Sequence, residues 1–323
     1  MLQHELIISQ HVIMPEDLAA AIHQAKLVPH QVRAKSSPSK LVRVLCESLC
    51  LDFASLSPAM LFTGAMPEDY YTLVFVTNCQ QKGRSFNFAI EHNDGYMGFF
   101  PPGGTVDAYT PEGYENATLT VPTAIFLHAI ERSFPDLPEN VLQNGIGIRI
   151  GIDEQLKLRE LLRMVLAIAE NPIDSVCFST VRSQLESDLL EAFLSALADG
   201  CQFANHKPNM RTERRQRKLR QARDYLFDHC HRPIQLESLC AELAMSKRGV
   251  EMLFQDLLGV SPNAYIRNQR LHGVRQALRE AVATPGIVKR TAYQWGFWHL
   301  GHFSREYQLL FGELPTSTVL RQP

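Results

Sequence analysis

The spacing of apolar residues changes along the chain and divides it into regions of different texture. Near the start, apolar positions at 15–28 and 40–52 recur at helical spacing, which predicts helices. From Tyr70 the pattern changes to short runs rich in Val, Thr, Tyr and Phe, separated by Gly, Pro, Asn and Asp, which predicts short strands. These runs are 70–78, 85–92, 96–109 and 117–130.

Two amphipathic segments follow the predicted strands, at 153–170 and 183–198. The polar stretch 205–213 has no apolar periodicity and predicts a linker, and helical spacing then continues to the end. We therefore expect an α+β chain with a domain over 1–204 and an all-helical domain over 214–323. The first would hold a small antiparallel barrel of the cupin-like kind, or a sandwich, followed by two helices.

The second amphipathic segment carries one broad apolar face. A stripe of this kind can pack on the strands of its own domain or form the seam of a homodimer, and the sequence leaves both possibilities open. The residues expected in such a seam are Leu185, Leu189, Phe193 and Leu197.

Composition places the chain among globular proteins and reveals an uneven charge. Its 323 residues include 32 Lys+Arg and 34 Asp+Glu. Residues 205–323 hold 19 of these basic residues and 10 of the acidic ones, a net charge of +9, which leaves the preceding part at -11. A basic excess confined to one half indicates a polyanionic partner, because Lys and Arg neutralise phosphates and release counterions.

Several classes of protein are excluded or disfavoured by composition. No apolar run approaches the roughly 18 residues of a membrane helix, and the first residues lack the regions of a secretory signal. The seven cysteines form no Cys-x-x-Cys pair, which indicates reduced thiols. We therefore expect a soluble, cytoplasmic protein that does not associate with membranes.

The basic half contains a weak internal repeat. Its apolar pattern predicts helices near 214–230, 235–243, 246–258, 261–281, 287–295 and 299–311. A series of positions matches at a constant offset of 53 residues, and it runs Ser246, Val250, Phe254, Leu257, Gly259, Pro262 against His299, Phe303, Tyr307, Leu310, Gly312, Pro315. Each copy predicts a helix-turn-helix unit, with Ala244 or Gly296 at its turn and Ser246 capping the second helix of the first copy.

Polar residues near the start of each second helix are left facing outward by this pattern. Side chains at that position reach base edges when such a helix lies in the major groove of DNA. The candidate DNA-binding residues are Ser246, Lys247, Arg248, Glu251 and Met252 in the first copy, and Trp298, His299, His302, Ser304 and Arg305 in the second.

The second copy, WGFWHLGHFSREYQLLFGELP, resembles the AraC/XylS family of transcription regulators. Gly296-Phe297, Ser304-Arg305 and Tyr307 stand at matching spacing, as do Phe303, Gly312 and Pro315, and the resemblance covers roughly 214–323. It implies a double helix-turn-helix domain that places two helices in successive major grooves of promoter DNA, bridged by the helix near 261–281. It also implies an N-terminal domain for dimerisation and effector binding, and contact with RNA polymerase.

Individual arginines are assigned different roles in DNA binding. Arg248 is the best candidate to read guanine, because its guanidinium can meet O6 and N7 together. Arg305 can read guanine or clamp a phosphate. Other arginines are expected to contact phosphates without reading the base sequence, or simply to form a solvated face. They are Arg267, Arg270 and Arg275 on the long helix, and Arg214, Arg215 and Arg217 before it. Leu300 and Gly301 depart from the polar face expected of a base-reading helix.

Within the family, Pro102-Gly103-Gly104-Thr105, Thr110–Tyr114 and GFWHLG resemble the ethanolamine-operon type of regulator. A small-molecule effector would then occupy the barrel, with aromatic side chains as its candidate walls. These are Phe75, Phe86, Phe88, Tyr96, Phe99, Phe100 and Tyr109, about half of which strand alternation would turn away. The alternative is a ligand-independent regulator, of the virulence or quorum-sensing type, whose barrel only dimerises or binds protein.

A third possibility is a metal-dependent cupin enzyme with a DNA-binding tail. The strand-like segments offer only His92 and His128 as imidazole ligands, without His-x-His spacing, and no phosphate loop or nucleophile motif is present. We therefore expect no catalytic site, no metal and no cofactor.

Overall fold

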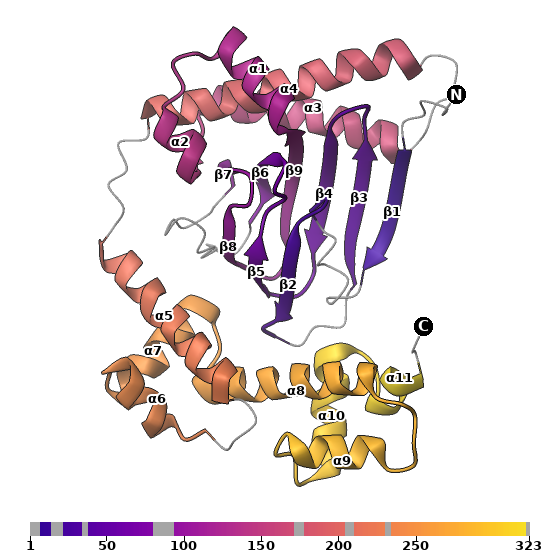
Figure 1. Ribbon diagram of the computed structural model, residues 1–323, viewed down its shortest axis with the longest axis vertical. Coiled ribbons are helices and arrows are strands. Elements are labelled where there is room, and N and C mark those ends of the chain that lie inside the picture. The colour runs from indigo at the N-terminus through magenta and orange to yellow at the C-terminus, as the bar shows by residue number, and fades with distance from the viewer. Residues whose placement is uncertain are drawn as a thin grey trace. The chain divides into compact units, whose positions relative to one another are not determined.

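The structure, a computed structural model, describes residues 7–13, 22–33, 38–79, 94–170, 178–203, 210–229 and 234–320. Its contacts divide the chain into two compact units. The first unit comprises Met1–Pro29, Pro38–Ser57 and Leu61–Lys207, and the second comprises Pro208–Pro323 with the short segments His30–Ser37 and Pro58–Met60. Figure 1 shows that strands dominate the first part of the chain and helices the second.

Two separate sheets form the strand-rich part. The larger has seven antiparallel strands in the order β1 (Ile7–Ile13), β3 (Ser39–Leu45), β4 (Cys50–Leu56), β9 (Tyr114–Pro122), β6 (Tyr70–Asn78), β7 (Tyr96–Phe100), β10 (Ile146–Arg149). The smaller has the order β2 (Lys26–Gln31), β5 (Met60–Ala65), β8 (Thr105–Thr110). The closed barrel that we expected is therefore not found: in the described residues each sheet pairs only with itself.

One face of the large sheet carries the core of the first unit. Successive side chains of a strand point to opposite faces, so Leu73 and Phe75 on β6 reach the same face as Phe99 on β7 and Leu119 on β9. Three helices cover this face and cross the strands, as Figure 1 shows: α1 (Thr123–Ser133), α3 (Ile152–Glu170) and α4 (Phe178–Phe203). The short helix α2 (Glu139–Asn144) precedes β10.

Strands replace one expected helix, and a helix replaces part of one expected strand. Residues 40–52 form β3 and the start of β4, because a strand buried on both faces lacks alternation and can mimic helical spacing. Leu41, Val42 and Val44 are all buried in β3. The run 117–130 divides at Pro122, where β9 ends and α1 begins. Residues 22–28 form a turn and the start of β2, whereas 14–21 and 85–92 lie outside the described residues.

The second unit is helical, and six of its helices were predicted from sequence. They are α5 (Met210–His229), α6 (Leu236–Leu243), α7 (Lys247–Leu258), α8 (Pro262–Glu280), α9 (Ile287–Gln294) and α10 (Leu300–Phe311), and the short α11 (Pro315–Leu320) follows. Helix α5 already begins at Met210, so four residues of the expected linker, 210–213, are helical. In the first unit, the two predicted amphipathic segments are confirmed as α3 and α4.

Candidate nucleic-acid interface

The first helix pair, α6 and α7, is closed by an apolar seam. Leu239 and Leu243 of α6 are fully buried, as are Val250 and Phe254 of α7. The chain turns between the helices at Ala244, which adopts a left-handed conformation with φ 47°. The Ser246 hydroxyl then accepts a hydrogen bond from the Gly249 N–H at 3.2 Å, so it caps α7 as predicted.

Helix α5 braces this first pair from the outside. Its Arg215 Nη2 lies 2.6 Å from Asp256 Oδ2 of α7, in an ion pair in which each side chain is about one third exposed. Its Gln221 Nε2 donates to Glu242 Oε1 of α6 at 3.1 Å. Arg215 is thus engaged within the protein, whereas Arg214 and Arg217 are exposed and accessible to phosphates.

The second pair, α9 and α10, repeats the arrangement with different chemistry. Phe303, Tyr307 and Leu310 of α10 are buried in a core that also includes Ala292 of α9. Gly296 takes the left-handed position at the turn, with φ 81°, where a glycine meets no Cβ strain. His299 precedes α10 but makes no side-chain capping bond.

The 53-residue repeat corresponds to equivalent positions along the helices of the two pairs. Val250 and Phe303 are buried at the same place in α7 and α10. Gly259 and Gly312 end these helices with left-handed φ angles of 65° and 71°. Another helix begins three residues later in each copy, α8 and α11 respectively. The repeat therefore describes a duplicated structural unit.

Helix α8 belongs to the cores of both pairs. Its Tyr265 ring lies edge-on to Phe254 of the first pair, with ring centroids 5.4 Å apart. Leu271 and Val274, further along α8, are buried in the core of the second pair. The Trp295 ring packs directly over Gly273, so close that any Cβ there would overlap it. One continuous helix thus joins the two pairs.

A buried polar network fastens α8 to the second pair. Arg275 Nη2 donates to Glu313 Oε1 at 2.9 Å, with both side chains less than 10% exposed. Thr318 Oγ1 donates to the same carboxylate oxygen at 2.8 Å, and Tyr307 Oη lies 2.7 Å from Thr318 Oγ1. The Arg275 guanidinium also lies over the Phe311 ring. The expectation that Arg275 contacts DNA backbone is therefore wrong, because its guanidinium is buried and paired with Glu313.

Most of the other predicted DNA-binding residues are exposed around the starts of α7 and α10. The exposed set comprises Ser246, Lys247, Arg248, Glu251, Met252, Arg267, Trp298, His299, His302 and Arg305. Ser304 and Arg270 are half-buried. Arg267 Nη1 also pairs with Glu306 Oε1 of α10 at 3.0 Å, which ties α8 to that helix.

Sequence reasoning missed an aromatic and basic cluster beside the second pair. The Tyr293 ring of α9 lies 5.6 Å from that of Trp298, which is 69% exposed. The Lys289 ammonium lies over the Tyr293 ring, 5.6 Å from the ring centre. The adjacent Lys289-Arg290 pair in the sequence was the available signal.

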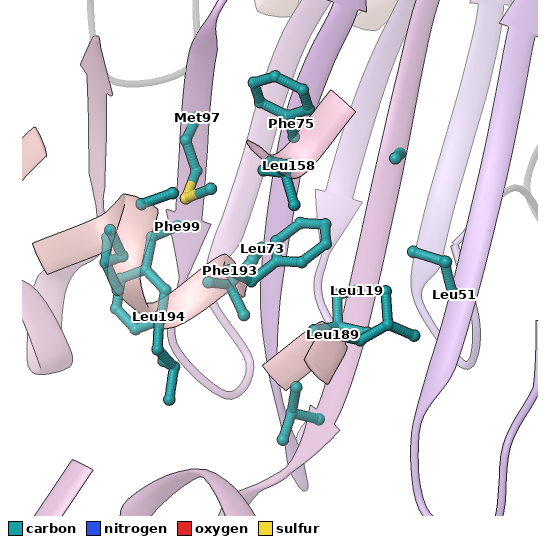
Figure 2. Packing of buried hydrophobic residues seen from close by; sticks show 14 of the residues in the cluster. Leu51, Leu73, Phe75, Met97, Phe99, Leu119, Leu158, Leu189, Phe193 and Leu194 are labelled. Atoms are coloured by element: carbon teal, nitrogen blue, oxygen red, sulfur yellow. The ribbon is translucent and has the colours of Figure 1, made fainter. Parts of the chain in front are cut away.

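The dimer-seam residues in α4 are placed in the core of their own unit. Figure 2 shows Leu189 and Phe193 lying among Leu73, Leu119 and other sheet residues. Leu189, Phe193 and Leu197 are fully buried, and Leu185 is half-buried against the same cluster. The expectation of a seam here is corrected: the large sheet occupies this face of α4, so a second subunit cannot reach it.

A pocket lies between the two sheets, but the predicted aromatic walls do not form it. Phe75 and Phe99 face the helices, while Tyr96 and Tyr109 do not line the pocket, and Phe86 and Phe88 lie outside the described residues. Among the predicted walls that the structure describes, Phe100 alone lines it. The other walls include Leu56, Phe62, Met66, Val74, Tyr114 and Asn116. Alternation along β6 explains the error, since Val74 faces the pocket between Leu73 and Phe75.

Neither a metal centre nor a membrane span occurs in the described ranges. No group of three or more His, Cys, Asp or Glu side chains there is arranged to hold a metal. His128 is exposed on α1, and His92 is not among the described residues. Among the described helices, none combines the length and hydropathy needed to cross a bilayer.

Comparison with known proteins places the likeness in the helical part of the chain. Residues 239–321 match a helix-turn-helix domain family. The XylDLEGF operon transcriptional activator of Pseudomonas putida is 38% identical over 95 residues, which are 29% of this chain and 30% of the activator. A probable thc operon regulatory protein of Rhodococcus erythropolis is 30% identical over 105 residues, 32% of each chain.

Among solved structures, a probable AraC family transcriptional regulator from Rhodopseudomonas palustris is 38% identical. The match covers 33% of this chain and 99% of that one, with a TM-score of 0.31. The chain thus spans about a third of the length of the curated relatives that it matches first. The helix-turn-helix match falls on the α6–α11 region, so this part of the chain is a helix-turn-helix domain, and the chain is similar to transcription regulators of the AraC/XylS kind.

Proposed function

We propose that the chain is a sequence-specific transcription regulator that binds promoter DNA through both of its helix pairs, used as two helix-turn-helix units. The observation that carries this proposal is the duplication itself. Two equivalent helices, α7 and α10, expose polar and basic residues at their starts, in a half of the chain with net charge +9. Helix starts are the positions that reach base edges in the major groove.

The length of α8 supports binding to successive grooves of one DNA face. A helix of 19 residues is about 28 Å long, which is similar to the roughly 34 Å of one DNA turn. Arg248 would read guanine from the first groove, and Lys247, Glu251 and Met252 would contact neighbouring edges. Arg305, Arg214 and Arg217 would hold phosphates and set the register.

The first unit would dimerise the protein and sense a small molecule. Its inter-sheet pocket supports sensing, and thus favours this alternative over a regulator whose first unit only dimerises. For the dimer contact we propose the outer face of α3, where Ile152 and Leu156 are 72% and 61% exposed one turn apart. A ligand that changes how the first units hold the DNA-binding units would change their effective concentration at paired half-sites.

Activation through contact with RNA polymerase is part of the same proposal and rests on the relatives named as activators. The narrower likeness to ethanolamine-operon regulators stays a prediction. The alternative of a cupin enzyme gains no support from the described residues, since His128, the candidate metal ligand among them, lies exposed on a helix. A cytoplasmic location also stays a prediction.

Selection of DNA from a random duplex library with the purified full chain tests the proposal. Performed at low and physiological salt, it separates base readout from the salt-sensitive binding to phosphates. We expect a recurrent motif of paired half-sites that persists at the higher salt. Enrichment without a motif, fading as salt rises, would show that the basic unit only anchors polyanions. Ile152→Glu with Leu156→Glu should turn a dimer into a monomer in light scattering.

A further inference from the structure

The pocket between the two sheets is a chemically defined space within the first unit. It lies on the face of the large sheet that does not carry the helices, between Val74 and Phe100 on that side and Ala108 of the small sheet on the other. Its empty space, including solvent at the mouth, is about 620 Å³. That value is an upper limit. The space open to the centre of a water-sized sphere is about 60 Å³, several times the roughly 10–15 Å³ that one water needs, which suits a single small molecule.

Apolar side chains form most of the pocket wall. The polar side chains that line it are Thr110, Tyr114 and Asn116, and no charged side chain of the described chain does so. Burial raises the pKa of the Tyr114 phenol above its ordinary value, so this group stays neutral. An ionic ligand would have to leave water without gaining a counter-charge, and this is strongly unfavourable.

Two charged side chains on this face of the sheet, Arg43 and Asp52, neutralise each other. Arg43 Nε and Nη2 bind the two carboxylate oxygens of Asp52, at 2.6 Å and 3.0 Å. The Asp52 side chain is fully buried, and its Oδ2 also accepts the His23 N–H. Because each charge of this two-point pair is matched by the other, the pair offers no net charge that would attract an ion.

One polar atom of the pocket lacks a partner. Asn116 Oδ1 is buried, and no described residue donates a hydrogen bond to it. The Asn116 side chain also forms a hydrogen bond with Tyr114, which orients the amide. A buried carbonyl oxygen left without a donor is costly, so the site is completed by a molecule that donates one hydrogen bond.

We propose that this pocket binds an uncharged, mostly apolar small molecule that carries a hydrogen-bond donor, such as an alcohol or a phenol. The donor group meets Asn116 Oδ1, and the hydrocarbon part lies against Val74, Phe100 and Ala108. The inference deepens the sensing role proposed for the first unit and rests on it. It names the chemistry of the effector, which the helix-turn-helix likeness does not address.

Titration calorimetry on the full chain, without DNA, tests this chemistry with four matched probes. They are hexan-1-ol, its isomer 1-methoxypentane, hexanoate and hexylammonium. Hexan-1-ol should bind with one site per chain. The ether, which has no donor, should bind about fivefold more weakly, and the two ions more than tenfold more weakly.

Three variants locate the binding. Asn116→Leu keeps the size of the side chain and removes the acceptor, so the alcohol and the ether should then bind equally. Val74→Phe and Ala108→Leu each fill the pocket and should weaken hexan-1-ol more than tenfold. A melting curve shows whether each pocket-filling variant folds. If one of the two does not fold, the other still tests the site.

The proposal is overturned if either ion binds as tightly as the alcohol. It is equally overturned if hexan-1-ol keeps its affinity in a folded, pocket-filled variant. The DNA selection is independent of these measurements: a paired motif with no alcohol binding rejects only the pocket chemistry. Alcohol binding with no motif rejects only the regulator.

Discussion

The two helix pairs of the second unit share one fold but are held together in different ways. In the first pair, Ser246 caps the second helix, the turn at Ala244 is a strained non-glycine turn, and the ion pair to α5 is about one third exposed. The second pair has a glycine turn, no capping side chain before α10 and a buried ion pair to α8. The two pairs thus share an apolar seam, but differ in their polar contacts and in the exposed residues at the starts of α7 and α10.

The surfaces that we propose to face DNA also differ between the two pairs. Helix α7 begins with exposed Lys247 and Arg248, whereas α10 begins with Leu300, which packs against the core, and Gly301, whose surroundings are open. The first pair thus offers more hydrogen-bonding groups to base edges. We expect the first pair to supply most of the sequence readout and the second to supply position and orientation.

Breaking the buried ion pair of the second helix pair should have the largest effect. Glu313→Gln leaves Arg275 buried without its counter-charge, which should lower the free energy of unfolding by about 3–5 kcal/mol. Both tryptophans of the chain, Trp295 and Trp298, lie in this pair, so urea unfolding followed by tryptophan fluorescence reports it directly.

Asp256→Asn is the matched control in the first pair. Its partner Arg215 is about one third exposed, so the loss should be at most about 1 kcal/mol. The double variant Arg275→Met with Glu313→Leu should recover much of the lost stability, because no charge is left buried. Equal losses for Glu313→Gln and Asp256→Asn would contradict the contrast between the two fastenings.

Removing one arginine from α7 and one from α10 compares the contributions of the two helix pairs to DNA binding. Arg248→Ala should weaken binding to the selected site by about 1–3 kcal/mol and relax preference at one base pair. Arg305→Ala should weaken selected and random DNA alike and reduce the salt slope by about one. Titrations of both sequences at several salt concentrations measure these effects.

The expected outcome depends on the different roles of the two arginines. A loss for Arg248→Ala that is the same on random DNA would reject its assignment to guanine. Arg217→Ala, in the exposed part of α5, serves as a second phosphate-type control, with the same salt behaviour expected as for Arg305→Ala.

Exchanging the turn residues tests the backbone difference between the pairs. Ala244 has a left-handed φ of 47°, and this conformation costs an L-residue about 1–2 kcal/mol. Ala244→Gly should relieve part of that cost and raise the melting temperature. Gly296→Ala should lower it by a similar free energy, since an added Cβ would meet Arg270 Nη1 only at an ordinary contact distance of 3.9 Å, and the cost is that of the left-handed backbone. Changes in the calorimetric melting temperature that have opposite signs in the two variants would confirm this difference, and changes of the same sign would contradict it.

The caps should give the smallest effects. Ser246→Ala removes the bond to the Gly249 N–H and should cost about 1 kcal/mol. His299→Ser introduces a cap where none exists and should stabilise α10 by about 0.5–1 kcal/mol. Thermal melting measures both, and DNA titration of His299→Ser shows in addition whether the imidazole contributes to binding. A stabilising effect of Ser246→Ala would be inconsistent with its capping role.

Much of the second unit could be predicted because its signals are local. Val250, Phe254 and Leu257 recur at helical spacing, Ser246 precedes a helix, and Gly259 and Gly312 end one. The role of Arg275 could not be predicted in this way. Its sequence position on α8 resembles that of Arg267, yet one is buried against Glu313 and the other is exposed, because only the packing of α11 brings that carboxylate close.

The amino-acid sequence by itself determined the helices of the second unit, their duplication at an offset of 53 residues and the outward placement of Arg248 and His302. These features depend on residues within one or two helical turns of each other. Tertiary structure alone decided that residues 40–52 are strands, that Leu189 and Phe193 are core, and that Asn116 faces a pocket. Each of these depends on which face of a strand or helix is covered by a distant segment, and that information is absent from local spacing.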